Sequence, residues 1–174
     1  MGFDKAMAPI EGATMLEVVV AAVAPIGDVV VVGRSDAPDG IAAIPDRRSS
    51  ARGPLTGLET ALDLHPDRTV VLVAVDHPFV SAQTLAALLE LDGDAVVPVD
   101  AGWQQVTCAI YRPSFLSAAS AILDEGGRSI IGALDRVEAR LVEENQWRSW
   151  GEDGRSWFSV DSLDRLADGI ERFG

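Results

Sequence analysis

Short apolar runs alternate with segments of helical periodicity along the whole chain. This alternation is typical of an α/β domain in which helices connect the strands of a parallel sheet. The run at 69–75 is the most apolar, and 105–111 alternates between apolar and polar residues. The predicted strands are 28–33, 40–45, 69–75, 94–99, 105–111, 139–142 at an edge, and 158–160.

Capping residues and prolines mark the helices between these runs. Thr14-Met15-Leu16-Glu17 is a capping box that opens a helix to about Ala24. Pro54 stands in the first turn of a helix that reaches Leu64, where its missing N–H costs nothing. Further helices are predicted from Ser81, Pro113, Ser129 and Asp161, over 81–91, 113–123, 129–134 and 161–170. The pattern assigns no element to 146–157, which holds three of the four tryptophans.

Length and charge narrow the class of protein. The 174 residues contain no repeat or long linker, so we expect one domain over 1–174. The net charge of −13 disfavours binding to nucleic acid or to an anionic membrane. One cysteine and two histidines exclude a disulfide framework and a Cys/His zinc cluster. Neither a membrane span nor a signal peptide is evident, so the expected location is cytoplasmic.

Ligands of open parallel α/β sheets lie at the carboxyl ends of the strands, so Asp76 is a candidate ligand-binding residue. This residue follows the most apolar predicted strand and precedes His77-Pro78. A carboxylate there can hold Mg²⁺, which prefers hard oxygen ligands and often a substrate phosphate. The alternative is a carboxylate that forms a turn or caps a helix, although Ser81 is better placed to cap the next helix.

The stretch Asp46–Gly57 follows another strand and combines an acid, three arginines and Gly53-Pro54-Leu55-Thr56-Gly57 at a helix start. Guanidinium groups suit phosphate oxygens, and the glycine and helix start offer backbone N–H groups to an anion. An ordinary solvated loop is the alternative for any single arginine.

Lys5 is the only lysine in a chain with 13 arginines. An ammonium group on a flexible stem can neutralise charge that develops on a phosphate. The alternative is an incidental residue on a solvated surface.

Taken together, these segments resemble the molybdenum cofactor guanylyltransferase family. The family pattern is Met-Gly-x-Asp-Lys-Ala, then an Asp before Gly-Pro-Leu-x-Gly, then a strand that ends in Asp-x-Pro. Here these motifs read Met1-Gly2-Phe3-Asp4-Lys5-Ala6, Asp46 before Gly53-Pro54-Leu55-Thr56-Gly57, and Asp76-His77-Pro78. Their order and spacing match over nearly the whole chain.

The resemblance implies a three-layer α/β/α fold with a mostly parallel, Rossmann-like sheet of the nucleotidyltransferase type. It implies Mg²⁺-dependent transfer of GMP from GTP to the phosphate of molybdopterin, with release of pyrophosphate. Lys5 and Asp76 would be catalytic, with Lys5, Asp46 and Gly53 at the nucleotide and Asp76 on the metal. Asp161 is a weaker metal candidate, because an Asp there can also cap a helix. Expected partners are GTP, molybdopterin and transient proteins of molybdenum cofactor biosynthesis or molybdoenzymes.

The chain departs from the family pattern in three places. Family members begin with an apolar strand and a Leu-Ala-Gly-Gly turn, whereas this chain opens at Met1-Gly2, so we expect the first strand and the glycine loop to be absent. Loss of an interior strand would leave two strands with unpaired edges. The closing segment carries Ser159 and Asp161 in place of asparagines. Gln104-Gln105-Val106 stands where the family has Gln-Pro, which affects contacts to the acceptor.

These departures leave two alternatives open. One is a relative that binds nucleotide or cofactor but has lost turnover. The other is a nucleotidyltransferase that uses CTP or a different phosphate acceptor. A Ser-His-Asp hydrolase and a dinucleotide oxidoreductase are disfavoured, because the chain has neither Gly-x-Ser-x-Gly nor a Gly-x-Gly-x-x-Gly after a strand.

Overall fold

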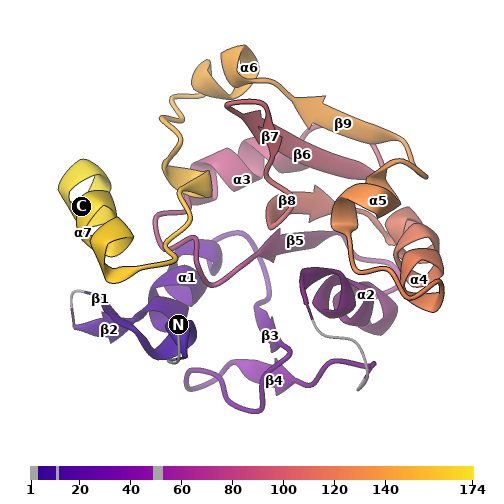
Figure 1. Ribbon diagram of the computed structural model, residues 1–174, viewed down its shortest axis with the longest axis horizontal. Helices are drawn as coiled ribbons and strands as arrows, with labels where there is room; N and C mark the ends of the chain where they lie inside the picture. Colours follow the sequence, from indigo (N-terminus) through magenta and orange to yellow (C-terminus); the bar gives the residue numbers. More distant parts are fainter. Residues whose placement is uncertain (1–3, 11, 49–52) are drawn as a thin grey trace.

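A five-stranded sheet lies at the centre of the structure, a computed structural model that describes residues 4–10, 12–48 and 53–174 (Figure 1). Its path runs β5-β8-β6-β7, and β9 pairs with β6. The strands are β5 Val70–Val73, β6 Ala95–Asp100, β7 Trp103–Gln104, β8 Cys108–Tyr111 and β9 Ala139–Val142.

Two small sheets accompany the central one. β3 (Val30–Val32) and β4 (Ala42–Ile44) are parallel, with Val31 opposite Ala43. β1 (Pro9–Ile10) and β2 (Ala13–Thr14) form an antiparallel pair that follows the 3₁₀ helix η1 (Lys5–Met7). The amino-terminal segment therefore lies outside the central sheet, near α1 and β3 (Figure 1).

Most predicted helices form where their caps indicate. The capping box at Thr14 is present, and the side chains of Ser81 and Ser129 cap the helices that follow them. No helix in the described part of the chain is long and apolar enough to cross a membrane. The helices are α1 Met15–Val23, α2 Pro54–Leu64, α3 Ala82–Leu89, α4 Leu116–Asp124, α5 Ile130–Leu134, α6 Glu144–Arg148 and α7 Leu163–Phe173, with 3₁₀ turns η2 Pro113–Phe115 and η3 Arg155–Trp157.

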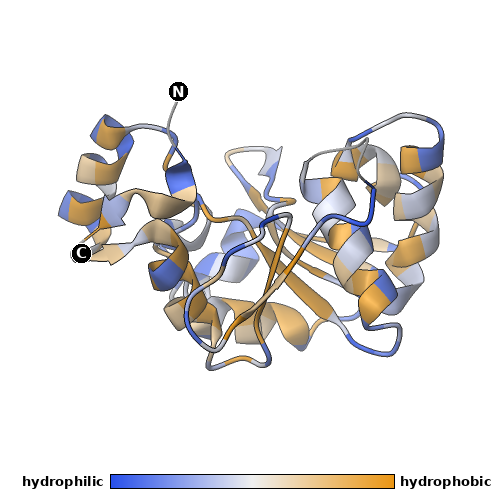
Figure 2. Cartoon of the chain, turned by 90° about the horizontal axis from the view of Figure 1, so that it is seen from below, coloured by the Kyte–Doolittle hydropathy of each residue, from blue (hydrophilic) through white to orange (hydrophobic). Residues whose placement is uncertain are grey.

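β6 and β8 of the central sheet are buried on both faces, whereas β5 is half-buried along its length. Successive side chains of a strand point to opposite faces, so Ala95 and Val97 of β6 join one apolar cluster and Val96 joins another. The first cluster includes α2, α4 and α5, and the second includes α3 and the edge-to-face pair Trp147 and Trp157. Figure 2 shows that hydrophobic residues are concentrated in the central strands.

The expectation of a mostly parallel sheet is wrong for the five-stranded sheet. β8 is antiparallel to both of its neighbours, β5 and β6, and β7 is antiparallel to β6. Only the β6–β9 pair is parallel. The short turn at Ala101-Gly102 reverses the chain after β6, with Ala101 at φ +48°. Such a tight reversal can join only antiparallel strands, whereas a parallel pair needs a long crossover.

Two predictions for the carboxyl-terminal part also need correction. Residues 158–160 form no strand, although the Val160 N–H donates a hydrogen bond to the main-chain oxygen of Asp76 at 2.8 Å. Asp161 does not cap the last helix, because the side chain of Ser162 accepts a hydrogen bond from the N–H of Arg165. The local Ser162 cap thus sets the start of α7, and the apolar side of this helix packs on Phe79 and Phe158.

The packing of α7 predicts opposite effects of two glycine substitutions. A Cβ at Gly169 would overlap the ring of Phe79 and lie 3.0 Å from Phe158 Cε1. Gly169→Ala should therefore destabilise the protein by about 1–3 kcal/mol. A Cβ at Gly132 in α5 meets ordinary contacts of 3.6 Å or more, so Gly132→Ala should stabilise by up to about 1 kcal/mol. Urea unfolding of both variants measures these changes. An equal stabilisation by both would show that α7 does not dock as described.

Candidate functional site

The carboxylate of Asp46 lies against the turn that follows β3. Gly33 ends that strand at φ +83°, and its N–H donates to the main-chain oxygen of Ile44 at 2.8 Å. A Cβ at Gly33 would lie 3.3 Å from Asp46 Oδ1, and one at Gly57 would lie 3.9 Å from the same oxygen. Asp46 is therefore packed between the end of β3 and the first turns of α2.

Gly53 is the N-cap of α2 and has φ +130°, a backbone conformation that only glycine adopts without strain. Its carbonyl oxygen accepts hydrogen bonds from the N–H groups of Thr56 at 3.1 Å and Gly57 at 3.3 Å. Pro54 occupies the first turn as predicted. The amino end of this 11-residue helix carries partial positive charge, which favours a nearby anion.

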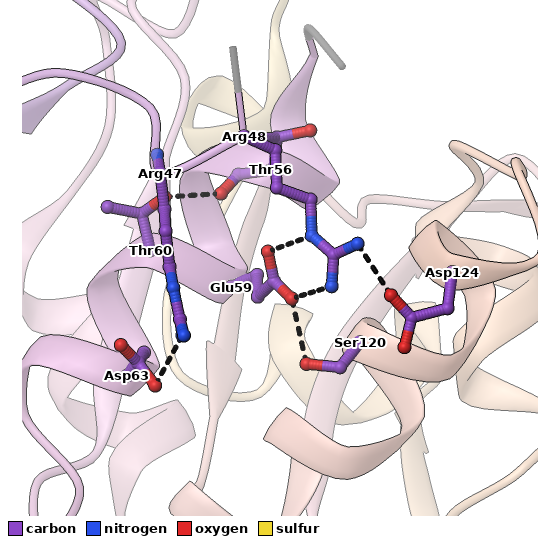
Figure 3. Close-up of polar contacts among 8 residues, drawn as sticks. All are labelled: Arg47, Arg48, Thr56, Glu59, Thr60, Asp63, Ser120 and Asp124. Atoms are coloured by element: carbon purple, nitrogen blue, oxygen red, sulfur yellow. Dashed lines mark hydrogen bonds and ion pairs between the residues drawn. The ribbon is translucent and has the colours of Figure 1, made fainter. Parts of the chain in front are cut away.

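The guanidinium of Arg48 is bound by carboxylates within the protein (Figure 3). Its Nε and Nη2 donate to the two oxygens of Glu59 at 2.7 and 2.6 Å, and its Nη1 donates to Asp124 at 2.6 Å. The Glu59 side chain is 2% exposed and also accepts a hydrogen bond from Ser120 at 2.8 Å. Through these ion pairs, Arg48 connects the start of the arginine-rich stretch to α2 and α4.

Arg47 is engaged in a similar way. Its Nη1 lies 2.6 Å from Asp63, and its main-chain N–H donates to Thr60 at 3.0 Å (Figure 3). Arg47 and Arg48, two of the three arginines predicted to suit phosphate, therefore pair with carboxylates here, and a phosphate would have to compete with those carboxylates. Arg52, the third arginine, lies outside the described residues.

Asp76 follows β5 and contacts the carboxyl-terminal segment. Its Oδ2 accepts a hydrogen bond from the Ser159 hydroxyl at 3.0 Å, and its carbonyl oxygen accepts one from Val160. The side chain is 28% exposed, so solvent or a ligand can reach the carboxylate. Ser159 stands at one of the positions where the sequence departs from the family pattern, and here it orients the proposed metal ligand.

His77 is buried next to Asp76. Its Nε2 lies 3.1 Å from the Thr107 hydroxyl and 3.8 Å from Asp76 Oδ1, whereas its buried Nδ1 has no hydrogen-bond partner in the described structure. Burial lowers the pKa of this imidazole, and the opposing attraction of Asp76 is smaller. The neutral ring therefore packs beside the carboxylate without supplying a positive charge, a role that the sequence pattern did not indicate.

Lys5 belongs to η1, whose position is set by its neighbour Asp4. The Asp4 carboxylate caps η1 through the N–H of Ala6 at 3.1 Å and pairs with Arg34 at 2.8 Å. The Arg34 guanidinium holds the pKa of Asp4 below its ordinary value. Arg34 directly follows Gly33, so this ion pair ties the segment of Lys5 to the carboxyl end of β3.

Lys5 and Asp161 line the same small hollow, together with Val160 and Ser162. Because Ser159 and Val160 bind Asp76, the segment 159–162 connects the surroundings of Lys5 with those of Asp76. Lys5 and Asp161 therefore lie at one hollow, and Asp76 contacts the preceding residues of the same segment. The structure places Asp46 beside Gly33 and at the start of α2, and the Asp4–Arg34 pair links the two groups.

Among the described residues, Asp76 is the one carboxylate at this place whose chemistry suits a magnesium ion that also binds a substrate phosphate. No group of three or more His, Cys, Asp or Glu side chains in the described ranges is arranged to hold a metal alone. Mg²⁺ commonly takes one or two carboxylates and completes its shell with water and substrate phosphates. The partly exposed Asp76 carboxylate can supply one such oxygen.

The fold is that of the α/β nucleotidyltransferases. Residues 1–137 match the family described as the MobA-like NTP transferase domain, and the chain belongs to that family. Molybdopterin-guanine dinucleotide biosynthesis protein A from Archaeoglobus fulgidus superposes with a TM-score of 0.83, at 22% identity over 98% of this chain and 91% of its own. A 2-C-methyl-D-erythritol 4-phosphate cytidylyltransferase from Thermus thermophilus reaches 0.72, at 18% identity over 97% and 92%.

Curated relatives carry names from the same family. A probable molybdenum cofactor guanylyltransferase from Natronomonas pharaonis is 31% identical over 70% of this chain and 61% of its own length. The molybdenum cofactor guanylyltransferase of Shewanella frigidimarina is 30% identical over 52% and 48%. The matched segments therefore span about half to three fifths of these relatives.

The Arg48–Glu59 pair predicts an acid-sensitive contribution to stability. The Arg48 guanidinium lowers the pKa of the Glu59 carboxyl in the folded protein. The ion pair therefore contributes its full stabilisation at a pH above the pKa that Glu59 has in the unfolded chain. This stabilisation is lost as the pH falls through the lower pKa of Glu59 in the folded protein. Glu59→Gln should cost about 1.5–3 kcal/mol at pH 7, and this deficit should shrink below about pH 4.3.

Urea unfolding across this pH range measures the effect. Asp63→Asn, which breaks the exposed Arg47–Asp63 pair, is the matched control and should cost no more than about 1 kcal/mol. An equal loss in the two variants, or a deficit for Glu59→Gln that is independent of pH, would contradict the buried ion pair.

Proposed function

We propose that this chain is a Mg²⁺-dependent guanylyltransferase that moves GMP from GTP to the phosphate of molybdopterin and releases pyrophosphate. The observation that carries the proposal is the closing segment 159–162, which contacts Asp76 through Ser159 and Val160 and lines a small hollow together with Lys5. The names of the relatives support GTP and molybdopterin as substrates. Such an enzyme acts in the cytoplasm, with transient partners in molybdenum cofactor biosynthesis.

The reaction makes a bond between an oxygen of the acceptor phosphate and the α-phosphorus of GTP. It breaks the bond from that phosphorus to the bridging oxygen, which leaves with pyrophosphate. Chemistry of this kind needs positioning and neutralisation of charge more than a covalent protein group. In the proposal, Lys5 contacts the phosphates, and Asp46 and Gly53 hold the nucleotide at the start of α2.

Asp76 would hold the magnesium ion, with Ser159 fixing the orientation of its carboxylate. Bound Mg²⁺ would neutralise triphosphate charge. Lys5 gains importance because Arg47 and Arg48 already pair with carboxylates and cannot serve phosphate without breaking those pairs. Asp161 lines the hollow beside Lys5 and is a second, weaker candidate for the metal.

Substitution of Asp76 tests the assigned metal ligand. Asp76→Asn keeps an oxygen that can accept the Ser159 hydrogen bond but removes the charge. Pyrophosphate release in the presence of GTP, Mg²⁺ and molybdopterin should fall by about 10²-fold or more, with an unchanged Tm. Asp135→Asn, at the exposed end of α5, is the control and should retain activity. A large drop in Tm for Asp76→Asn would instead identify a structural carboxylate.

Nucleotide binding distinguishes the proposed enzyme from a relative without turnover. Calorimetry should show saturable binding of GTP that depends on Mg²⁺ and weakens when a chelator removes the metal. GTP should also support faster pyrophosphate release than CTP. GTP binding with no pyrophosphate release would favour the binding relative, and preference for CTP would favour a cytidylyltransferase.

A further inference from the structure

Glu152 is a buried carboxylate that the proposed reaction does not use. It stands shortly before η3 and is 5% exposed. Its Oε1 accepts hydrogen bonds from the N–H groups of Gly154 at 2.7 Å and Ser156 at 3.3 Å. Its Oε2 accepts hydrogen bonds from the hydroxyls of Thr84 at 2.6 Å and Ser156 at 2.5 Å. Both oxygens of the carboxylate are therefore occupied by donors of the protein.

Hydrogen bonds, and not a contacting cation, satisfy this carboxylate. None of the ion pairs among the described residues includes Glu152. The neighbouring Arg155 pairs with Asp153 at 3.0 Å. A buried carboxylate is costly unless every lone pair finds a donor, so the backbone around Glu152 must keep one arrangement.

The same hydrogen bonds join residues 152–156 to the start of α3. Thr84 lies in the first turn of that helix, and Ser81 is its N-cap. The Ser156 hydroxyl, which donates to Glu152, also accepts a hydrogen bond from the main-chain N–H of Ser81 at 3.0 Å. The segment between α6 and α7 therefore passes beside the start of α3 (Figure 1).

Further contacts continue from this junction to Asp76. The ring of Phe158 meets the ring of Phe79 edge to face, with centroids 6.0 Å apart. The Ser159 hydroxyl then donates to the Asp76 carboxylate, and the Val160 N–H donates to the Asp76 carbonyl oxygen.

These contacts follow a regular order along the two segments 152–160 and 76–84. Residue numbers rise along the first segment as they fall along the second, so the segments lie antiparallel. Hydrogen bonds fix both ends, with Glu152 at one end and Asp76 at the other. Displacement of residues 152–156 from α3 would therefore move the Ser159 hydroxyl that orients the Asp76 carboxylate.

We propose that Glu152 is a positioning residue for the metal ion that Asp76 would hold. The inference rests on the proposed function, because Asp76 is a metal ligand only in that proposal. Glu152 does not contact the metal, since its side chain is buried and both of its oxygens are occupied. It acts through segment 152–160, which brings Ser159 to Asp76. Residues that orient a metal ligand commonly change metal affinity by roughly 10–100-fold when they are substituted.

Two substitutions at Glu152 separate its hydrogen bonds from its charge. Glu152→Ala removes every hydrogen bond to the carboxylate. Glu152→Gln keeps one oxygen for the two N–H groups, and its amide group can donate to the hydroxyls of Thr84 and Ser156, which also accept hydrogen bonds. The glutamine variant is therefore the conservative rescue. Thr84→Val, which removes one donor, is a milder second variant that should shift each measurement in the same direction as Glu152→Ala.

Leu134→Ala is the control for a general loss of stability. Leu134 is buried in the cluster of α2, α4 and α5, whereas Phe79 and Phe158 belong to a different cluster. This variant should lower Tm, because it leaves a cavity, without disturbing segment 152–160.

Hydrogen exchange of the Val160 amide and calorimetry with GTP test the positioning role. In Glu152→Ala, this amide should exchange about tenfold faster or more. The affinity for GTP in the presence of Mg²⁺ should fall about tenfold, whereas the residual affinity for GTP with a chelator should not change. Glu152→Gln should restore both values, and Leu134→Ala should alter neither.

Each departure from this result has a distinct meaning. Unchanged Val160 exchange in Glu152→Ala and Thr84→Val would overturn the inference, because segment 152–160 would then keep its place without these hydrogen bonds. Faster exchange with an unchanged affinity for GTP and Mg²⁺ would also overturn it, since the segment would not govern the metal. Absence of Mg²⁺-dependent GTP binding in the unsubstituted protein would instead overturn the proposed function, and the positioning role with it.

Discussion

The alternation of side chains along β5 is the constraint that the rest of the structure depends on. Val70 and Leu72 pack with the cluster of α2, α4 and α5, whereas Val71 and Val73 pack with the cluster of α3. Val75, just beyond the strand, contacts the two remaining clusters, which hold the amino-terminal segment, α1 and α7. One short apolar segment therefore touches all four cores. Burial of its side chains fixes the place where the chain leaves the sheet, and Asp76 stands at that place.

The acidic composition of the chain disfavours binding of a triphosphate, which is itself negatively charged. With a net charge of −13, the protein must gather positive charge locally. Arg34, Arg47 and Arg48 are each paired with carboxylates, so their charges stabilise the fold. Among the described residues of the proposed site, the positive groups that remain for a phosphate are Lys5 and the amino end of α2, to which a bound cation would add. Because these arginines are engaged in ion pairs, the single lysine becomes important for the proposed contact with phosphate.

The sequence predicts local structure better than strand pairing. The Thr14 capping box and the Ser81 and Ser129 caps depend on neighbouring residues, and all three are confirmed. The direction of β8 could not be predicted, because it depends on β5 and β6, which are distant in the chain. The ion pairs could not be predicted from the sequence either, because the contact of Arg48 with Asp124 joins residues 76 positions apart. Local patterns place Asp46 and Asp76 after strands, which is how the sequence identified them, whereas the Ser159 hydroxyl reaches Asp76 only through the packing of the carboxyl-terminal segment.

The candidate site draws its residues from two separate sheets. Asp46 follows β4 of the β3–β4 pair, whereas Asp76 follows β5 of the five-stranded sheet. Among the described residues, no ladder hydrogen bonds join these two sheets. Their relative position therefore depends on side-chain packing through α1 and α2 and on the ion pairs of Arg34 and Arg68. Exposed ion pairs contribute little and hold geometry loosely, whereas transfer between phosphates requires close positioning.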